Sequence, residues 1–220
     1  MRIVAISDIH GDQRARRFID GIIGASSPDL LVICGDITTF GPASFAEPLL
    51  SGLKVKCAAV PGNCDTAEVL GVIEKHCISL HGRRVEIDGI QFVGLGGAPL
   101  CSHSTPLELE ESEIDSFLSK TMVENCVIVS HAPPVGTNDI TKSGRSLGSS
   151  SLAKYVEQYR PRLLLSGHVH EARSVVEKNG TVFANPGPLK EGFAVVAELS
   201  ANGTTAKLVD FNSILGFAHK

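Results

Sequence analysis

Five short polar segments of the sequence contain side chains that bind metal ions, and each segment follows an apolar run. The candidate ligands are Asp8, His10, Asp36, Asn63, His131, His168 and His170. Together they offer carboxylate oxygens, one amide oxygen and imidazole nitrogens. This donor set suits transition metals such as Mn, Fe, Zn, Ni or Co better than Ca or Mg. Seven side chains are too many for one ion, but they suffice for two ions if one residue bridges them.

Each of these residues also has a simpler interpretation. An Asp after a Gly can merely form a turn, and a single His after a strand can be an ordinary polar residue. His168-Val169-His170 alone is weak evidence as well. The recurrence of such groups at five strand ends favours the metal-site interpretation, because the simpler one must hold independently at every end.

The first part of the chain alternates between expected strands and helices. Residues 2–6, 29–34 and 55–60 are short apolar runs with β-branched residues, which is typical of buried strands. Helical spacing of apolar residues predicts a helix that Asp12 caps and that ends near Gly24. Further helices are predicted over about 42–50 and 66–75. Such alternation predicts parallel strands, so their polar carboxyl ends should meet at one edge of a sheet.

The second part of the chain lacks the regular alternation of strands and helices, but polar residues again follow its expected strands. Asp88-Gly89 predicts a hairpin between residues 83–87 and 90–95. The further predicted elements are helices over 106–120 and 149–159, strands over 127–129 and 162–165, a long loop over 131–148, and β-strands over 172–177, 181–184, 193–199 and 206–211. Two facing sheets with helices outside fit this pattern, and we expect residues 1–220 to form a single domain.

Composition restricts the classes of function. The 220 residues are 43% hydrophobic and 20% charged, and the net charge of −4 argues against a broad nucleic-acid-binding surface. The six cysteines form no Cys-x-x-Cys pair and favour buried, reduced thiols. The sequence contains no signal-peptide pattern and no apolar run long enough to span a membrane. We therefore expect a cytoplasmic protein without membrane partners.

The combined motifs resemble a known family. The segments Asp8-x-His10, Gly35-Asp36, Gly62-Asn63-x-Asp65, Ser130-His131 and Gly167-His168-x-His170 occur in the order and context of the calcineurin-like metallophosphoesterases. The resemblance spans about residues 3 to 187. It implies an α/β fold, a four-layer α/β/β/α sandwich with two mixed sheets, and a dinuclear metal centre between the sheets. Gly62-Asn63-Cys64-Asp65 and Asn185-Pro186-Gly187 resemble the small bacterial and archaeal branch, which includes short phosphodiesterases.

The resemblance also implies an assignment of ligands. Asp8, His10, Asp36 and His170 would hold one metal. Asp36, Asn63, His131 and His168 would hold the other, with Asp36 as the bridge. Two cations roughly 3.5–4 Å apart need such an anionic bridge, and a hydroxide shared by them can attack phosphorus in line. Two divalent ions are therefore the expected cofactors, with Mn as the first choice.

One position departs from the family pattern. Many members have a His after the Asn of the third motif, which is thought to protonate the leaving oxygen, whereas this chain has Cys64. A thiol is a weaker candidate for that acid, and Cys64 can equally be a packing residue. Asp65 is expected to orient Asn63 or His131 rather than to bind metal. Arg14, Arg16 and Arg17 form either a solvated helix face or a contact to substrate phosphate.

These observations lead to an expected function with alternatives. We expect a metal-dependent phosphoester hydrolase, favouring diesters, whose substrate is a small phosphoester or a nucleotide. The alternatives are a phosphomonoesterase, a nuclease of the same superfamily, and a catalytically weak scaffold for protein binding. All seven ligand positions are retained, which argues against the scaffold. The apolar C-terminal third could pair two protomers in a homodimer or lie within the sheets.

Overall fold

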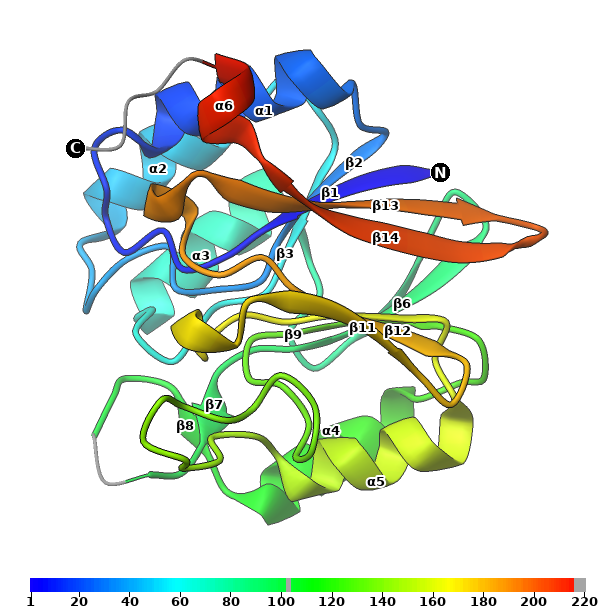
Figure 1. Ribbon diagram of the computed structural model, residues 1–220. Coiled ribbons are helices and arrows are strands. Elements are labelled where there is room, and N and C mark those ends of the chain that lie inside the picture. The colour runs from blue at the N-terminus through cyan, green and yellow to red at the C-terminus, as the bar shows by residue number, and fades with distance from the viewer. Residues whose placement is uncertain (102–103, 216–220) are drawn as a thin grey trace.

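The computed structural model describes residues 1–101 and 104–215, and their strands form two large sheets that face one another (Figure 1). The first sheet consists of β1 (Arg2–Ile6), β2 (Leu30–Ile33), β3 (Cys57–Ala59), β4 (Ile78–Ser79), β13 (Phe193–Ser200) and β14 (Gly203–Asp210), in the order β14-β13-β1-β2-β3-β4. The second consists of β5 (Arg84–Ile87), β6 (Ile90–Leu95), β9 (Val127–Ser130), β10 (Leu163–Leu165), β11 (Ser174–Lys178) and β12 (Thr181–Asn185), in the order β11-β12-β10-β9-β6-β5.

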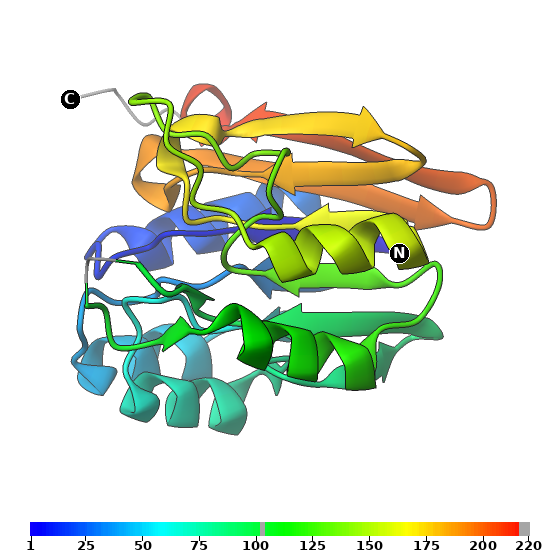
Figure 2. The ribbon, with the colours of Figure 1, turned by 90° about the horizontal axis from the view of Figure 1, so that it is seen from below.

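Helices cover the outer face of each sheet. The helices over the first sheet are α1 (Ala15–Ser26), α2 (Ala43–Ser51), α3 (Ala67–His76) and the short α6 (Phe211–Leu215). The helices over the second sheet are α4 (Glu111–Thr121) and α5 (Ser150–Tyr159). Two single-turn helices, η1 (His170–Ala172) and η2 (Leu189–Glu191), complete the fold. Figure 2 shows α4 and α5 in front of their sheet.

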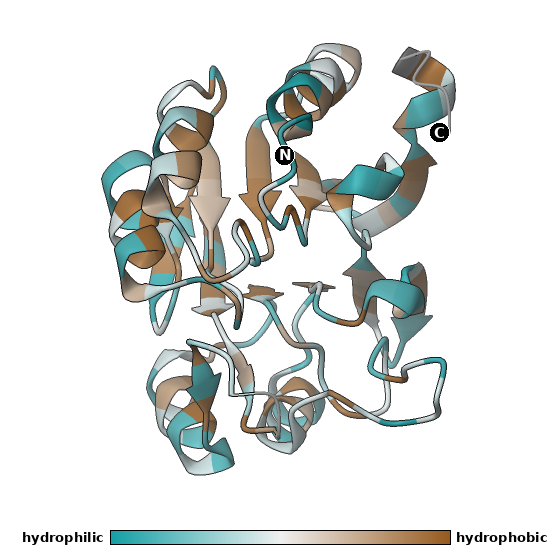
Figure 3. Ribbon diagram, turned by 90° about the vertical axis from the view of Figure 1, so that its left-hand side faces the viewer, coloured by the Kyte–Doolittle hydropathy of each residue, from teal (hydrophilic) through white to brown (hydrophobic). Residues whose placement is uncertain are grey.

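The two sheets and the two sets of helices form four layers, and three clusters of apolar side chains lie between these layers. Along β1, Ile3 and Ala5 belong to the cluster between the two sheets, whereas Val4 and Ile6 belong to the cluster under the helices of the first sheet. This alternation follows from the period of two in a β-strand, and both faces are apolar because both are covered. A third cluster lies between the second sheet and helices α4 and α5. Figure 3 shows the resulting apolar strands and the more hydrophilic outer helices. The four-layer α/β/β/α sandwich is thus confirmed.

The strand directions bring the polar strand ends together. Strands β1 to β4 are mutually parallel, and β6, β9, β10 and β12 are mutually parallel in the second sheet. The C-terminal strand β13 pairs antiparallel with β1, and β14 pairs with β13. The apolar C-terminal strands therefore complete the first sheet. Among the described residues, no helix is long and apolar enough to cross a membrane.

Several local predictions differ from the structure. The short strand β4 was not predicted, nor were β7 (Ala98–Pro99) and β8 (Glu108–Leu109), which pair with each other. This pairing removes residues from the predicted helix over 106–120, so α4 begins only at Glu111. Asp12 does not cap α1, because its carboxylate instead accepts the Arg14 backbone N–H at 2.9 Å and pairs with the Arg14 guanidinium.

Candidate metal centre

The seven predicted ligands lie at the carboxyl ends of five parallel strands. Asp8 and His10 follow β1, Asp36 follows β2, and Asn63 follows β3 in the first sheet. His131 follows β9 in the second sheet, while His168 and His170 follow β10. Each sheet therefore contributes side chains to the same edge of the sandwich, although the segments are up to 160 residues apart in the sequence.

Backbone hydrogen bonds continue beyond the strand ends and fix the loops there. The N–H of Asp8 donates to Gly35 O at 3.1 Å, and the N–H of His10 donates to Asp36 O at 2.9 Å. On the second sheet, the N–H of Gly167 donates to His131 O at 2.9 Å. The ligand-bearing segments are thus extensions of the sheets rather than independent loops, which limits the freedom of their side chains.

The backbone of this region is unusual. Asp8, His10, Asp36 and His168 all have positive φ angles, between 50° and 65°. Residues other than Gly rarely adopt this region, and such conformations concentrate at functional sites. They persist only where the surrounding structure enforces them, as the neighbouring strands do here. This signal is independent of the side-chain types from which the site was predicted.

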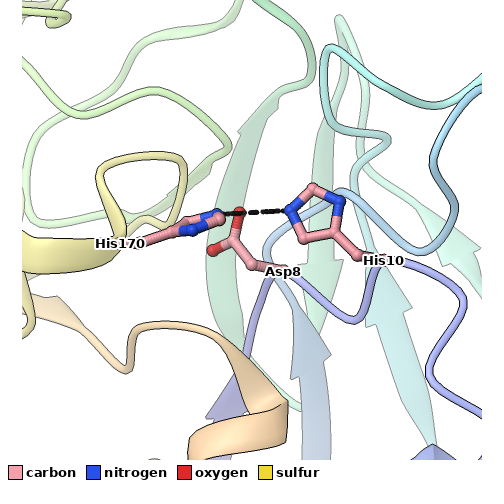
Figure 4. A group of neighbouring side chains, drawn as sticks. All are labelled: Asp8, His10 and His170. Atoms are coloured by element: carbon pink, nitrogen blue, oxygen red, sulfur yellow. Dashed lines mark hydrogen bonds and ion pairs between the residues drawn. The ribbon is translucent and has the colours of Figure 1, made fainter.

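Asp8, His10 and His170 form one half of the site (Figure 4). The Nε2 atoms of His10 and His170 are 3.2 Å apart, and the Nε2 of His170 lies 3.3 Å from Asp8 Oδ1. Asp8 is fully buried, whereas His10 and His170 retain side-chain exposures of 23% and 40%. The site is therefore reached from the side of these two imidazoles.

Asp36 lies between this half and a second, more buried half. Its Oδ2 is 3.6 Å from His10 Nε2, and its Oδ1 is 3.5 Å from His131 Nε2. Asp8, Asp36 and His131 form a further close group of potential ligand atoms. One carboxylate thus presents one oxygen to each half, which is the position expected of a bridging ligand.

The short distance between His131 and Asn63 shows whether the side chains of this half suit a metal ion. His131 Nδ1 donates to the backbone oxygen of Cys34 at 2.8 Å, so in the neutral ring Nε2 is an acceptor. This Nε2 lies 2.9 Å from the amide oxygen of Asn63, which is also an acceptor. Two acceptors at this distance require a cation or a proton between or beside them. Ligand atoms about 2.1 Å from one ion lie roughly 3.0–3.4 Å apart, so the spacings of the site fit divalent metal ions.

His168 lies beside the same half. Its backbone N–H donates to both carboxylate oxygens of Asp8, at 3.3 and 3.2 Å. Its ring packs edge-on against the ring of His131, with centroids 5.0 Å apart. His168 is thus placed next to His131, as the predicted ligand set requires, and it also holds Asp8 through its backbone.

The carboxylates and imidazoles of the site shift one another's pKa values. Burial alone would raise the pKa of Asp8, but the hydrogen bond from His170 and the nearby imidazoles lower it to about 2. The hydrogen bond to Asp8 raises the pKa of His170. Burial lowers the pKa of His131, yet Asp36 and Asp8 outweigh this effect and raise it. Burial lowers the pKa of the less enclosed His10.

Asp65 forms hydrogen bonds with the backbone of the loops and not with the side chains of the predicted ligands. Its carboxylate accepts the backbone N–H groups of Ile37, Thr38 and Gly62 at 2.8 to 3.1 Å, and also the Thr38 hydroxyl. The sequence predicted that Asp65 orients Asn63 or His131. The structure shows contact to the loop backbones next to Asp36 and Asn63. Burial and the Asp36 carboxylate raise the pKa of Asp65 to about 6.

Cys64 lies closer to the ligands than the sequence could indicate. Its Sγ belongs to a group with His10 and Asp36 in which the potential ligand atoms all lie within 4.8 Å of one another. Its backbone N–H donates to Asp36 Oδ1 at 2.8 Å. Burial and the Asp36 carboxylate raise the pKa of the Cys64 thiol, which makes it a poor proton donor.

Two supporting residues were not predicted. Thr39 Oγ1 lies 3.1 Å from His10 Nδ1 and so orients the imidazole, with Nε2 toward the centre. The hydroxyl of Ser7 donates to Cys34 O at 3.2 Å, next to the bond from His131 to the same oxygen. In the sequence, Ser7 is marked only by its position directly before Asp8, and Thr39 only by its position in the loop that follows Asp36.

Comparisons with known proteins find similar sequences and similar folds. An uncharacterized protein of Methanocaldococcus jannaschii is 35% identical over 199 residues, which cover 86% of this chain and 88% of that protein. A structure of a Thermus thermophilus protein is similar with a TM-score of 0.70 and 19% identity, over 94% and 97% of the two chains. A structure described as a novel archaeal phosphodiesterase is similar with a TM-score of 0.57 and 16% identity, over 95% and 100%.

The family model for calcineurin-like phosphoesterases matches residues 1–172, which contain every predicted ligand of the metal centre. The matched region extends from the first strand to the end of the segment that carries His168 and His170. The chain therefore belongs to the calcineurin-like phosphoesterase family.

Proposed function

We propose that the protein is a phosphodiesterase that works with two divalent metal ions. The observation that carries this proposal is the position of Asp36, whose two oxygens lie 3.6 and 3.5 Å from the Nε2 atoms of His10 and His131. A carboxylate shared between two sets of ligands offsets the repulsion of two nearby cations. A single-ion site would not need both of its oxygens.

The residues divide into two sets around Asp36. Asp8, His10 and His170 would hold one ion together with Asp36, and Asn63, His131 and His168 would hold the other. When bound, such ions polarise a phosphoryl group and lower the pKa of water. Mn is our first choice, and Fe, Zn, Ni or Co are compatible with the same donors.

The protein's own residues position and shield the reaction. Asp8 and His131 are fully buried and exclude water from the back of the site, while His10 and His170 border its open side. The hydrogen bond between His131 and Cys34 O fixes the ring so that Nε2 points inward, and Thr39 does the same for His10. Substrate therefore approaches past His10 and His170.

The position of Cys64 supports a preference for good leaving groups. Its thiol lies near His10 and Asp36. Because the surroundings raise the pKa of the Cys64 thiol, it holds its proton tightly. The leaving oxygen must then depart without that proton or obtain it from solvent.

The motif Gly62-Asn63-Cys64-Asp65 and the archaeal phosphodiesterase of the same fold support diesters over monoesters.

The proposal extends to the substrate class and to the assembly of the protein. We propose a small phosphoester or nucleotide as substrate, and a single catalytic domain that acts without nucleic acid or membrane partners. A homodimer is compatible with the fold.

The test compares a diester with a monoester on one preparation. Metal-stripped protein is reloaded with Mn, its bound metal is counted, and hydrolysis of bis-p-nitrophenyl phosphate is measured against p-nitrophenyl phosphate. We expect two ions per chain and faster cleavage of the diester. Faster cleavage of the monoester would assign a phosphatase, and fewer than two ions would refute the dinuclear assignment.

The scaffold alternative makes a separate prediction in the same assay. A scaffold that retains the ligands would bind two ions and hydrolyse neither ester. The nuclease alternative would appear as cleavage of a single-stranded oligonucleotide at a rate well above that of the small diester.

A further inference from the structure

A cavity of about 540 Å³ opens directly beside the metal centre, between the loop that follows β1 and the start of helix α2. His10 lines it and is also one of the proposed metal ligands. The Nδ1 of this imidazole contacts Thr39, which also lines the cavity, and Nε2 faces Asp36 and His170. A group attached to a phosphate at the centre can therefore extend into the cavity. Its volume is within the range typical of small-molecule sites.

One wall of the cavity is apolar and includes an aromatic ring. Phe45 and Leu49 of α2 line it, together with Pro42 and Pro48. Phe45 is partly buried and packs against the apolar cluster under α1, α2 and α3. One part of the ring is thereby fixed, while another part borders the cavity. A fixed aromatic ring beside two prolines favours a flat group over a branched or flexible one.

The cavity is also lined by polar residues whose charges are compensated. These are Asp12 and Gln13, which precede α1, and Arg16 in its first turn. Arg16 donates from Nε to Asp20 at 2.8 Å and from Nη2 to the backbone oxygen of Gly52 at 2.8 Å. Asp12 is paired with Arg14. A second phosphate would meet a carboxylate and a guanidinium that is already paired, so the cavity is unsuited to an additional anion.

From this geometry we infer that the cavity binds the base of a nucleoside phosphodiester, with the flat ring beside Phe45 and its polar edge toward Asp12 and Gln13. A nucleobase is planar, uncharged and carries N–H donors and carbonyl or ring-nitrogen acceptors at its edge. A carboxylate accepts such donors, and the Gln amide can both donate and accept. This inference rests on the proposed phosphodiesterase function, since it assigns the substrate class of the same site.

The test uses two substrates that share leaving group and charge. Thymidine 5′-(p-nitrophenyl phosphate) and methyl p-nitrophenyl phosphate are both monoanionic diesters that release p-nitrophenolate, and they differ in the presence of a nucleoside. The Mn-loaded protein is assayed with both. We expect kcat/KM to be at least about ten-fold higher for the nucleoside ester, the size of one base–aromatic stacking interaction.

Two variants locate the effect in the cavity. Phe45→Leu keeps an apolar side chain for packing and removes the ring, and Gln13→Ala removes an exposed amide that makes one long hydrogen bond, to Gly11 O at 3.4 Å. Each should reduce the ratio of kcat/KM for the nucleoside ester to that for the methyl ester, by about ten-fold for Phe45→Leu. Phe40→Ala is the matched control, because Phe40 lies in the same segment, is 59% exposed and does not line the cavity.

The outcomes separate this inference from the proposed function. If the protein hydrolyses neither ester, the phosphodiesterase function itself fails. If it hydrolyses both at similar kcat/KM, the function stands and the nucleobase site is refuted. A fall in both activities in Phe45→Leu, with an unchanged ratio, would likewise refute it, because the ring would then serve packing alone.

Discussion

Asp36 is the residue on which the two halves of the proposed centre depend. It is almost fully buried, and its carboxylate oxygens face His10 on one side and His131 on the other. The N–H of Cys64 holds one of these oxygens at 2.8 Å. A buried carboxylate surrounded by imidazoles stabilises positive charge, and its neutral amide analogue keeps the shape while removing the charge.

Asp36→Asn is therefore expected to lose metal and activity together. Without the bridging charge, two close cations repel each other, and we expect kcat/KM for bis-p-nitrophenyl phosphate to fall by at least about a hundred-fold. Bound metal, measured by elemental analysis, should fall below two ions per chain. Asp115→Asn is the matched control, because Asp115 forms only a surface ion pair with Lys154 on helices α4 and α5. Full occupancy and turnover in Asp36→Asn would refute the assignment of the bridge.

Cys64→His tests whether a missing proton donor limits the reaction. The thiol lies within 4.8 Å of ligand atoms of His10 and Asp36, and its surroundings raise its pKa. An imidazole at this position donates a proton more readily near neutral pH, with a typical contribution of roughly a hundred-fold. We expect faster hydrolysis of a diester with a poorer leaving group, such as methyl phenyl phosphate, which releases phenol, and little change for a p-nitrophenyl ester. Equal rates for the phenyl ester in both proteins would show that proton donation is not limiting.

At the scale of elements, the site forms because the loops at the strand ends pack closely against one another. A Cβ on Gly62 would lie 2.0 Å from Asp36 Oδ1 and 2.2 Å from the Asp36 nitrogen. A Cβ on Gly167 would lie 1.8 Å from the Ser7 hydroxyl and 2.6 Å from Asp8 Oδ2. Both glycines directly precede predicted ligands, so the absence of a side chain allows the loops to pack against the carboxylates.

Gly62→Ala should accordingly displace Asp36 and destabilise the fold. Overpacking of this kind typically costs about 1–3 kcal/mol. We expect the free energy of unfolding in urea to fall by that amount and the bound metal to fall with it. Gly71→Ala is the matched control within helix α3, where a Cβ meets nothing within 4 Å. Helix propensity predicts that it is up to about 1 kcal/mol more stable than the wild type. Equal stability and metal content in both variants would contradict the proposed role of close approach.

The sequence predicted the site best where a metal-binding side chain directly follows an apolar strand. The alternation of apolar runs and polar tips predicted two facing sheets with helices outside, and it placed Asp8, Asp36 and His131 at strand ends. The family resemblance implied the four-layer sandwich.

The remainder depends on long-range contacts that no local pattern reports. Strand β4 has two residues and exists because it pairs with β3. Asp12 resembles a helix cap, yet it binds Arg14 instead. The proximity of Cys64 to His10, the support of His10 by Thr39 and the cavity beside them all depend on how separate loops meet. Only the folded chain brings these residues together.

At the scale of the whole molecule, the proposed ions connect the two sheets. Asp8, His10, Asp36 and Asn63 come from the first sheet, and His131, His168 and His170 come from the second. The apolar layer between the sheets already holds them together, but at this edge buried carboxylates and imidazoles take the place of apolar contacts. Bound cations should therefore stabilise the sandwich as a whole, since ligands from both sheets are absent from any single unfolded segment.

Removal of metal is therefore expected to lower the melting temperature, and the effect should depend on pH. At a free metal concentration of about 100 Kd the stabilisation is about 3 kcal/mol, which corresponds to roughly 5–10 °C for a chain of this size.

The sign of the pH dependence follows from the histidines. The pKa values of His131 and His170 are raised above 6.5, so protons compete with metal until the pH exceeds them. In the metal-free protein, the same two groups stabilise the fold fully below 6.5, and this contribution is lost as pH rises through their raised pKa values. Both effects widen the gap between the metal-loaded and metal-free protein with rising pH. Thermal unfolding with and without EDTA should thus show a larger difference at pH 8 than at pH 6. A difference that is equal at both values, or larger at pH 6, would mean that these imidazoles are not the groups that bind the metal.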